Sequence, residues 1–140
     1  MNPDKEVKSK TVRILMVDDD QDDYIIIRDL LASLPFHRFD ITWTSACPEG
    51  MKILIRQEHD VCLLDYRLGT HDGFEILKEA SLRGTDTPII FLTGQGEYEV
   101  DVRAMKAGAA DYLVKDTLTA SLLERSIRYT LDRMSVARAL

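Results

Sequence analysis

The chain has 140 residues, of which 45% are hydrophobic and 30% charged, and its formal net charge is −6. These values are typical of one soluble globular domain. The negative charge argues against a surface that follows the phosphates of a nucleic acid. No apolar run approaches the roughly 18 residues of a membrane span, and residues 1–10 have no apolar signal core. The sequence therefore predicts a cytoplasmic protein with no nucleic-acid or membrane partner.

Short apolar runs alternate with segments of helical spacing along the chain. After a polar, lysine-rich stretch at 1–10, which we expect to be a flexible tail, strands are expected at 12–17, 39–44, 60–65, 88–93 and 110–115. Helices are expected at 21–34, 47–58, 73–83 and 97–107, and from about 118 to 139. Several strands lack polar alternation, which is typical of parallel strands buried on both faces. Five βα units predict an α/β fold, with a doubly wound parallel sheet and helices on both faces.

The two cysteines and the single tryptophan are expected to have structural roles only. Cys47 and Cys62 lack the spacing of a metal site and lie among apolar residues. We therefore expect buried free thiols in a reducing compartment. Trp43, at the end of the second expected strand, is predicted to be a packing residue in the core or at an edge.

The residues that close the expected strands share a common chemistry. Asp18 and Asp19 end the first strand, Asp65 the third, Thr93 the fourth and Lys115 the fifth. Because function in such sheets collects outside the carboxyl ends of the strands, we expect these side chains to converge. Carboxylate oxygens suit Mg²⁺, lysine and threonine suit phosphoryl oxygens, and an aspartate can act as a nucleophile. The strand ends predict a Mg²⁺-assisted phosphoryl site.

The acidic run from residue 18 to residue 23 divides into two parts. Asp20 is expected to cap the first helix, and Asp22 and Asp23 to lie in its first turn, where the helix dipole favours negative charge. Only Asp18 and Asp19 are assigned to the metal site.

Four motifs then occur in order, each at the end of an expected strand: ILMVDDD, VCLLDYRLGTHDGFEIL, PIIFLTGQGE and AGAADYLVKD. Together they resemble the receiver domain of response regulators in two-component signalling, over residues 11–131. The resemblance implies a flavodoxin-like fold with strand order 2-1-3-4-5 and five helices, and Mg²⁺ (or Mn²⁺) as the cofactor. It also implies a signalling domain that catalyses only its own phosphorylation and dephosphorylation, so it is not classed as an enzyme. Residues 132–140 would extend the C-terminal helix.

The resemblance assigns the chemistry of the site residue by residue. Asp65 matches the phosphoacceptor. Asp18 and Asp19 match the acidic pair that holds the metal, with Asp65 and the backbone carbonyl of Arg67 as further ligands. Lys115 matches the lysine that pairs with the acyl phosphate.

The resemblance also implies a switch. Thr93 matches the hydroxyl that bonds a phosphoryl oxygen and moves inward on activation, and Tyr112 matches the aromatic side chain that then turns inward. Tyr112 could equally be a half-buried aromatic residue of the strand. Arg67 and Gln95 lie where this family tunes the lifetime of its acyl phosphate.

One departure from the family lies directly after the lysine. The family usually has a proline there, joined through a cis peptide, whereas this chain has Asp116. A cis bond before a residue other than proline costs roughly 3 kcal/mol. We therefore expect either a trans peptide with a remodelled loop or a strained cis bond.

The resemblance implies partners for both steps of signalling. A histidine kinase or phosphotransfer protein would supply the phosphoryl group, and a protein target or covalently linked output module would respond to it. The chain is then a single-domain regulator or one detached from its output module. A homodimer would form through the C-terminal helix or the face of the fourth helix, fifth strand and fifth helix. That long helix is open to three interpretations: a dimer seam, a lead into a further domain, or a frayed end.

Three alternative functions remain to be weighed. An aspartate-nucleophile phosphohydrolase would need a second acid two residues after its nucleophile, where this chain has Arg67. A flavin- or nucleotide-binding module would need a Gly/Ser/Thr-rich phosphate loop after the first strand, where this chain has five aspartates. A degenerate receiver that only binds partners is the third alternative, and the complete set of strand-end residues argues against it.

Overall fold

The fold is built on one sheet of five parallel strands. The structure is a computed structural model that describes residues 11–35, 38–69, 71–94 and 98–139; the tail expected at 1–10 lies outside this range. The strands of the sheet are β1 (Thr11–Val17), β2 (Arg38–Thr44), β3 (Val61–Asp65), β6 (Ile89–Thr93) and β7 (Asp111–Val114). Their order across the sheet is β2-β1-β3-β6-β7. Counted among themselves in chain order, this is the predicted 2-1-3-4-5 arrangement.

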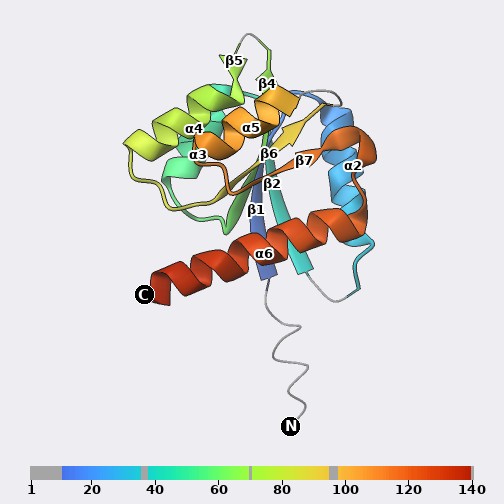
Figure 1. Cartoon of the computed structure of the whole chain (residues 1–140). Coiled ribbons are helices and arrows are strands. Elements are labelled where there is room, and N and C mark those ends of the chain that lie inside the picture. The colour runs from blue at the N-terminus through green and yellow to red at the C-terminus, as the bar shows by residue number, and fades with distance from the viewer. Residues whose placement is uncertain (1–10, 36–37, 70, 95–97, 140) are drawn as a thin grey trace.

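Helices cover both faces of this sheet, as predicted. They are α2 (Gln21–Ala32), α3 (Cys47–Ile55), α4 (Gly73–Leu82), α5 (Tyr98–Lys106) and α6 (Ala120–Ala139). In Figure 1, α2 and α6 lie on one side of the sheet, and α3, α4 and α5 on the other. None of the helices in the described ranges combines the length and the apolar character needed to cross a bilayer.

Strand β1 shows why the core has two halves. Successive side chains of a strand point to opposite faces, and Ile14, Leu15, Met16 and Val17 are all 0% exposed. Leu15 and Val17 belong to a hydrophobic cluster with residues of α3, α4 and α5, and Ile14 and Met16 to one with residues of α2 and α6. The unbroken apolar runs in the sequence thus reflect burial on both faces.

Three short elements were not predicted. Residues Arg67–Leu68 (β4) and His71–Asp72 (β5) pair antiparallel as a small second sheet. The chain after β7 forms a 3₁₀ turn, η1 (Lys115–Thr117), so Lys115 follows the fifth strand instead of ending it. No peptide bond within the described residues is cis. Of the two expectations for the bond between Lys115 and Asp116, the trans peptide with a turn is therefore correct.

The start of the last helix and the burial of one cysteine differ from the predictions. Helix α6 begins at Ala120, two residues later than expected, because the Thr119 hydroxyl accepts the N–H of Leu122 and so satisfies a free donor of the first turn. The helix runs continuously to Ala139, and a dimer seam along it stays a prediction.

Cys62 is fully buried, as expected, whereas Cys47 is only half-buried. The prediction for Cys47 was wrong because this residue begins α3 at the end of the sheet.

Candidate functional site

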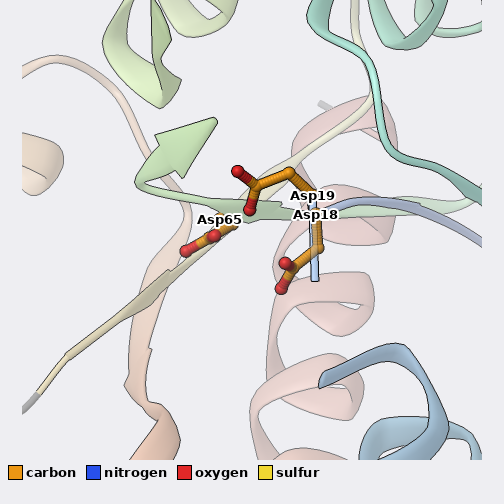
Figure 2. A group of neighbouring side chains, drawn as sticks. All are labelled: Asp18, Asp19 and Asp65. Atoms are coloured by element: carbon orange, nitrogen blue, oxygen red, sulfur yellow. The ribbon is translucent and has the colours of Figure 1, made fainter. Parts of the chain in front are cut away.

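Three carboxylates meet at the carboxyl edge of the sheet. Asp18 and Asp19 follow β1, and Asp65 ends β3, the middle strand, which pairs directly with β1. One carboxylate oxygen from each residue lies within 4.8 Å of those of the other two. Figure 2 shows the three side chains gathered around the ends of these strands. Asp18 is fully buried, Asp65 is 7% exposed, and Asp19 is exposed.

Asp18 is held by its main chain and by one carboxylate oxygen. Its N–H donates to the carbonyl of Thr44 over 3.1 Å, and its carbonyl accepts the indole N–H of Trp43 over 2.8 Å. Its Oδ1 accepts the N–H of Asp20 over 2.9 Å. The second oxygen, Oδ2, is buried and has no hydrogen-bond partner. A buried carboxylate oxygen without a hydrogen bond favours a cationic partner, and Lys115 Nζ lies 3.1 Å from it.

Asp19 and Asp20 connect the site to its surroundings. Asp19 Oδ2 accepts the N–H of Gly69 over 2.9 Å, and Gly69 has a φ of +66°, which glycine adopts without strain. This bond fixes the segment that follows β4 beside the acidic pair. Asp20 caps α2 as predicted, because its side chain accepts the N–H of Asp22.

Lys115 lies among three carboxylates. Its Nζ is 3.0 Å from Asp65 Oδ1, 3.1 Å from Asp18 Oδ2 and 2.5 Å from Asp23 Oδ2. The first two contacts were expected from the strand ends. Asp23 was expected only in the first turn of α2, where it does lie, and its contact with Lys115 was missed. The sequence holds no signal for this contact, since the two residues are 92 positions apart.

The environment shifts the protonation of these groups. Burial raises the pKa of Asp18 to about 7, the Asp65 charge adds to the rise, and the Asp20 N–H and Lys115 oppose it. Burial also raises the pKa of Asp65, against the effect of Lys115. Burial alone would lower the pKa of Lys115, but contacts with Asp23, Asp65 and Asp18 raise it above its usual range. The lysine therefore stays charged and partly neutralises the cluster.

Thr93 and Tyr112 lie beside the site on β6 and β7. Thr93 ends β6 and is 1% exposed, and its hydroxyl has no hydrogen-bond partner. Tyr112 is 37% exposed and lies two residues before Val114, the register partner of Thr93. The structure thus places Thr93 at the carboxyl edge and Tyr112 two residues before it on the neighbouring strand.

The two candidate tuning positions have different outcomes. Arg67 lies on β4 with its guanidinium 5.8 Å from the centre of the Tyr66 ring. Gln95 lies outside the described residues.

A cleft opens beside Asp19 and Asp65, two of the three clustered aspartates. Its volume is about 430 Å³, and its lining includes Asp19, Asp23, Asp65, Arg67 and Lys115. Larger clefts, of about 450 and 500 Å³, lie elsewhere and contain none of the predicted site residues. The chemistry of its lining therefore makes the smaller cleft the candidate site.

The three aspartates fit a divalent metal ion. Mg²⁺ and Mn²⁺ prefer carboxylate oxygens and retain several waters, and one oxygen from each of Asp18, Asp19 and Asp65 is close enough to share an ion. Of these ligand atoms, Asp18 Oδ2 would be stabilised most by a bound ion, because it is buried and has no hydrogen bond. A cation there would also offset the repulsion between the carboxylates.

Fold and pocket together define a doubly wound α/β domain with an acidic site at the carboxyl edge of its sheet. The family model of the response regulator receiver domain, found in two-component systems, matches residues 14–127, and the chain belongs to this family.

Individual relatives agree with this assignment. The chain is 34% identical over 106 residues to the alginate biosynthesis transcriptional regulatory protein AlgB of Pseudomonas aeruginosa, covering 76% of this chain and 23% of that protein. It is 33% identical over 122 residues to the response regulator MprA of Mycobacterium leprae, covering 87% of this chain and 52% of that protein. The chain thus spans about half or less of these relatives. A solved receiver domain from Clostridium thermocellum matches with a TM-score of 0.79 and 28% identity, covering 90% of this chain and 98% of that one.

Proposed function

We propose that this receiver domain accepts a phosphoryl group on the Asp65 carboxylate, from a histidine kinase or phosphotransfer protein, in a reaction that requires Mg²⁺ or Mn²⁺. The observation that carries the proposal is the position of Asp65, whose carboxylate belongs to the acidic cluster with Asp18 and Asp19 and lies 3.0 Å from Lys115 Nζ. A nucleophile in the middle of a cation-binding cluster suits attack on an anionic phosphorus centre.

The proposed transfer is an in-line displacement. A bond forms between an Asp65 oxygen and phosphorus while the bond from phosphorus to the donor's imidazole nitrogen breaks, and the imidazole retains that electron pair and takes up a proton. A bound divalent cation would supply charge stabilisation for the transferring group. Asp18 and Asp19, with the backbone carbonyl of Arg67, would hold this ion together with Asp65.

Lys115 and Thr93 would bind the phosphoryl oxygens. Once the Asp65 oxygen carries the phosphoryl group, the N–H of Lys115 that it accepted is free to donate to a phosphoryl oxygen. The Thr93 hydroxyl, buried and without a hydrogen-bond partner, would donate to another. Both groups would stabilise the charge of the acyl phosphate.

The proposed response is a change on the surface of α5, β7 and α6. Movement of Thr93 toward the phosphoryl group would allow Tyr112, 37% exposed on β7, to turn inward. A protein target, a linked output module or a second copy of the chain would bind the altered surface. Arg67 and Gln95 would tune the lifetime of the acyl phosphate.

The proposal also covers the bounds of the domain and the kind of regulator to which it belongs. We assign residues 11–131 to the receiver domain and 132–140 to an extension of its last helix, in a cytoplasmic regulator that works alone or with a separate output module. The match of the family model to residues 14–127 supports these bounds. Catalysis would be limited to the domain's own phosphorylation and dephosphorylation.

The test uses a small phosphodonor. The protein is incubated with acetyl phosphate, with and without Mg²⁺, and its intact mass is measured. We expect a gain of one phosphoryl group that requires Mg²⁺ and is absent from Asp65→Asn. A gain that persists in this variant, or no gain at all, would overturn the proposal.

A further inference from the structure

Three carboxylates surround the ammonium group of Lys115 in this structure. A lysine ammonium has three N–H groups, and Nζ lies within 3.1 Å of oxygens of Asp18, Asp65 and Asp23. These carboxylates come from the ends of two strands and from the first turn of α2. Two of them, Asp18 and Asp65, also belong to the cluster that fits a metal ion, whereas Asp23 does not.

The side chain of Asp23 is available to Lys115 because Asp18 accepts the capping N–H that a residue at this helix position often binds. Asp23 is the third residue of α2, where an acidic side chain often reaches back to the N–H of the capping residue. Here that N–H, of Asp20, donates to Asp18 Oδ1 over 2.9 Å. The next residue, Tyr24, stacks on Trp43 with ring centroids 5.0 Å apart and an interplanar angle of 8°. The first turn is thus fixed, and Asp23 faces Lys115.

Entry of a divalent cation would create a conflict in this cluster. Asp18 and Asp65 would turn their charge to the ion, and Lys115 would then lie beside two further positive charges. The ammonium must keep at least one carboxylate partner for the ion to bind without an uncompensated, partly buried lysine. Asp23 is the partner that the ion leaves in place, and it has the shortest contact with Nζ of the three.

We propose that Asp23 is a positioning residue that holds Lys115 when a divalent cation displaces it from Asp18 and Asp65, and so makes room for the ion. This inference rests on the proposed function, since it concerns the same site. In it, Asp23 contributes its charge to metal affinity without ligating the metal. It also keeps Lys115 near Asp65, ready for the phosphoryl group.

The experiment measures Mg²⁺ affinity directly, without a phosphodonor. Trp43 is the single tryptophan of the chain, and its indole N–H bonds the carbonyl of Asp18, so its fluorescence reports on the site. Titration calorimetry supplies a second measurement of the same Kd. The variants are Asp23→Asn, Asp23→Glu as the conservative change, and Asp22→Asn as the matched control, which removes the same charge from an exposed residue of the same turn.

We expect Asp23→Asn to weaken Mg²⁺ binding by about five- to tenfold, and Asp23→Glu and Asp22→Asn to change it by less than about twofold. With acetyl phosphate, Asp23→Asn should raise the Mg²⁺ concentration that gives half-maximal phosphorylation. Equal shifts of Kd in Asp22→Asn and Asp23→Asn, or no shift in the latter, would overturn the inference. If the wild type binds Mg²⁺ but gains no phosphoryl group, the proposed function fails, while the Kd values still decide the role of Asp23.

Discussion

Trp43 on β2 donates a hydrogen bond from its indole N–H to the main-chain carbonyl of Asp18, over 2.8 Å. The ring of Trp43 also stacks on Tyr24 of α2. One side chain therefore connects the edge strand, the start of the first helix and the backbone of the acidic pair. This explains how a residue expected only to pack comes to support the site.

Replacing Trp43 with phenylalanine removes this hydrogen bond and keeps an aromatic ring against Tyr24. We expect the free energy of unfolding to fall by about 1–2 kcal/mol, because a part-buried carbonyl loses its donor, and Mg²⁺ binding to weaken as the Asp18 backbone loosens. Urea unfolding and calorimetric titration check the two effects. Tyr24→Phe keeps both the stacked ring and the Asp18 hydrogen bond, so it serves as the control. Equal effects of the two variants would contradict this account.

Gly73, the first residue of α4, lies against the backbone of Asp65, the proposed phosphoacceptor. A Cβ added there would lie 2.9 Å from the main-chain carbonyl oxygen of Asp65, closer than carbon and oxygen normally approach. We expect Gly73→Ala to lower the free energy of unfolding by about 1–3 kcal/mol and to slow phosphorylation by acetyl phosphate severalfold, because Asp65 must shift. Stability is measured by urea unfolding and the rate by intact mass.

Gly84→Ala is the control for this substitution. Gly84 has a φ of +70° and no atom near an added Cβ, so alanine should cost about 1 kcal/mol through backbone strain alone. Its phosphorylation rate should match wild type. A normal rate in Gly73→Ala would show that Asp65 tolerates the displacement.

The raised pKa of Asp18 predicts a pH dependence for the metal-free protein. Burial raises this pKa from 3.8 to about 7, so the folded state keeps a proton that the unfolded state releases. The contribution of Asp18 to the free energy of unfolding should therefore be fully present below about pH 4. It should be lost as the pH rises through about 7. Relative to Asp18→Asn, the wild type should lose about 2–4 kcal/mol over that range.

Urea unfolding of both proteins in chelator, at several pH values, measures this difference. Added Mg²⁺ should restore much of the lost stability to the wild type at neutral pH, since it binds the folded state alone. A difference between wild type and Asp18→Asn that stays constant with pH would contradict the assigned cause.

The central strands β1, β3 and β6 were predictable because they carry runs of residues buried on both faces. Ile14 to Val17 are all fully buried, and that burial requires the unbroken apolar run seen in the sequence. The β4–β5 pair was not predictable, since strands of two residues each are too short to show an alternation of polarity. The end of the fifth strand was placed one residue late because nothing local distinguishes a last strand residue from the first residue of a 3₁₀ turn.

The site was predictable where its residues end strands of one parallel sheet. This rule brought together Asp18, Asp19 and Asp65, which the structure gathers in one cluster, and Lys115, which contacts two of them. It could not find Asp23, because the helix dipole already accounts for an acid in a first turn. Its contact with Lys115 joins residues 92 positions apart, and only the fold shows that contact.

The central claim is tested most directly by locating the phosphoryl group in the chain. After reaction with acetyl phosphate, borohydride reduces an aspartyl phosphate to homoserine, and peptide mass spectrometry identifies the altered position. The account predicts homoserine at residue 65 alone, only in samples that contained Mg²⁺ or Mn²⁺. Homoserine at Asp18, Asp19 or Asp23, or no reduced residue in a protein that has gained phosphoryl mass, would contradict it.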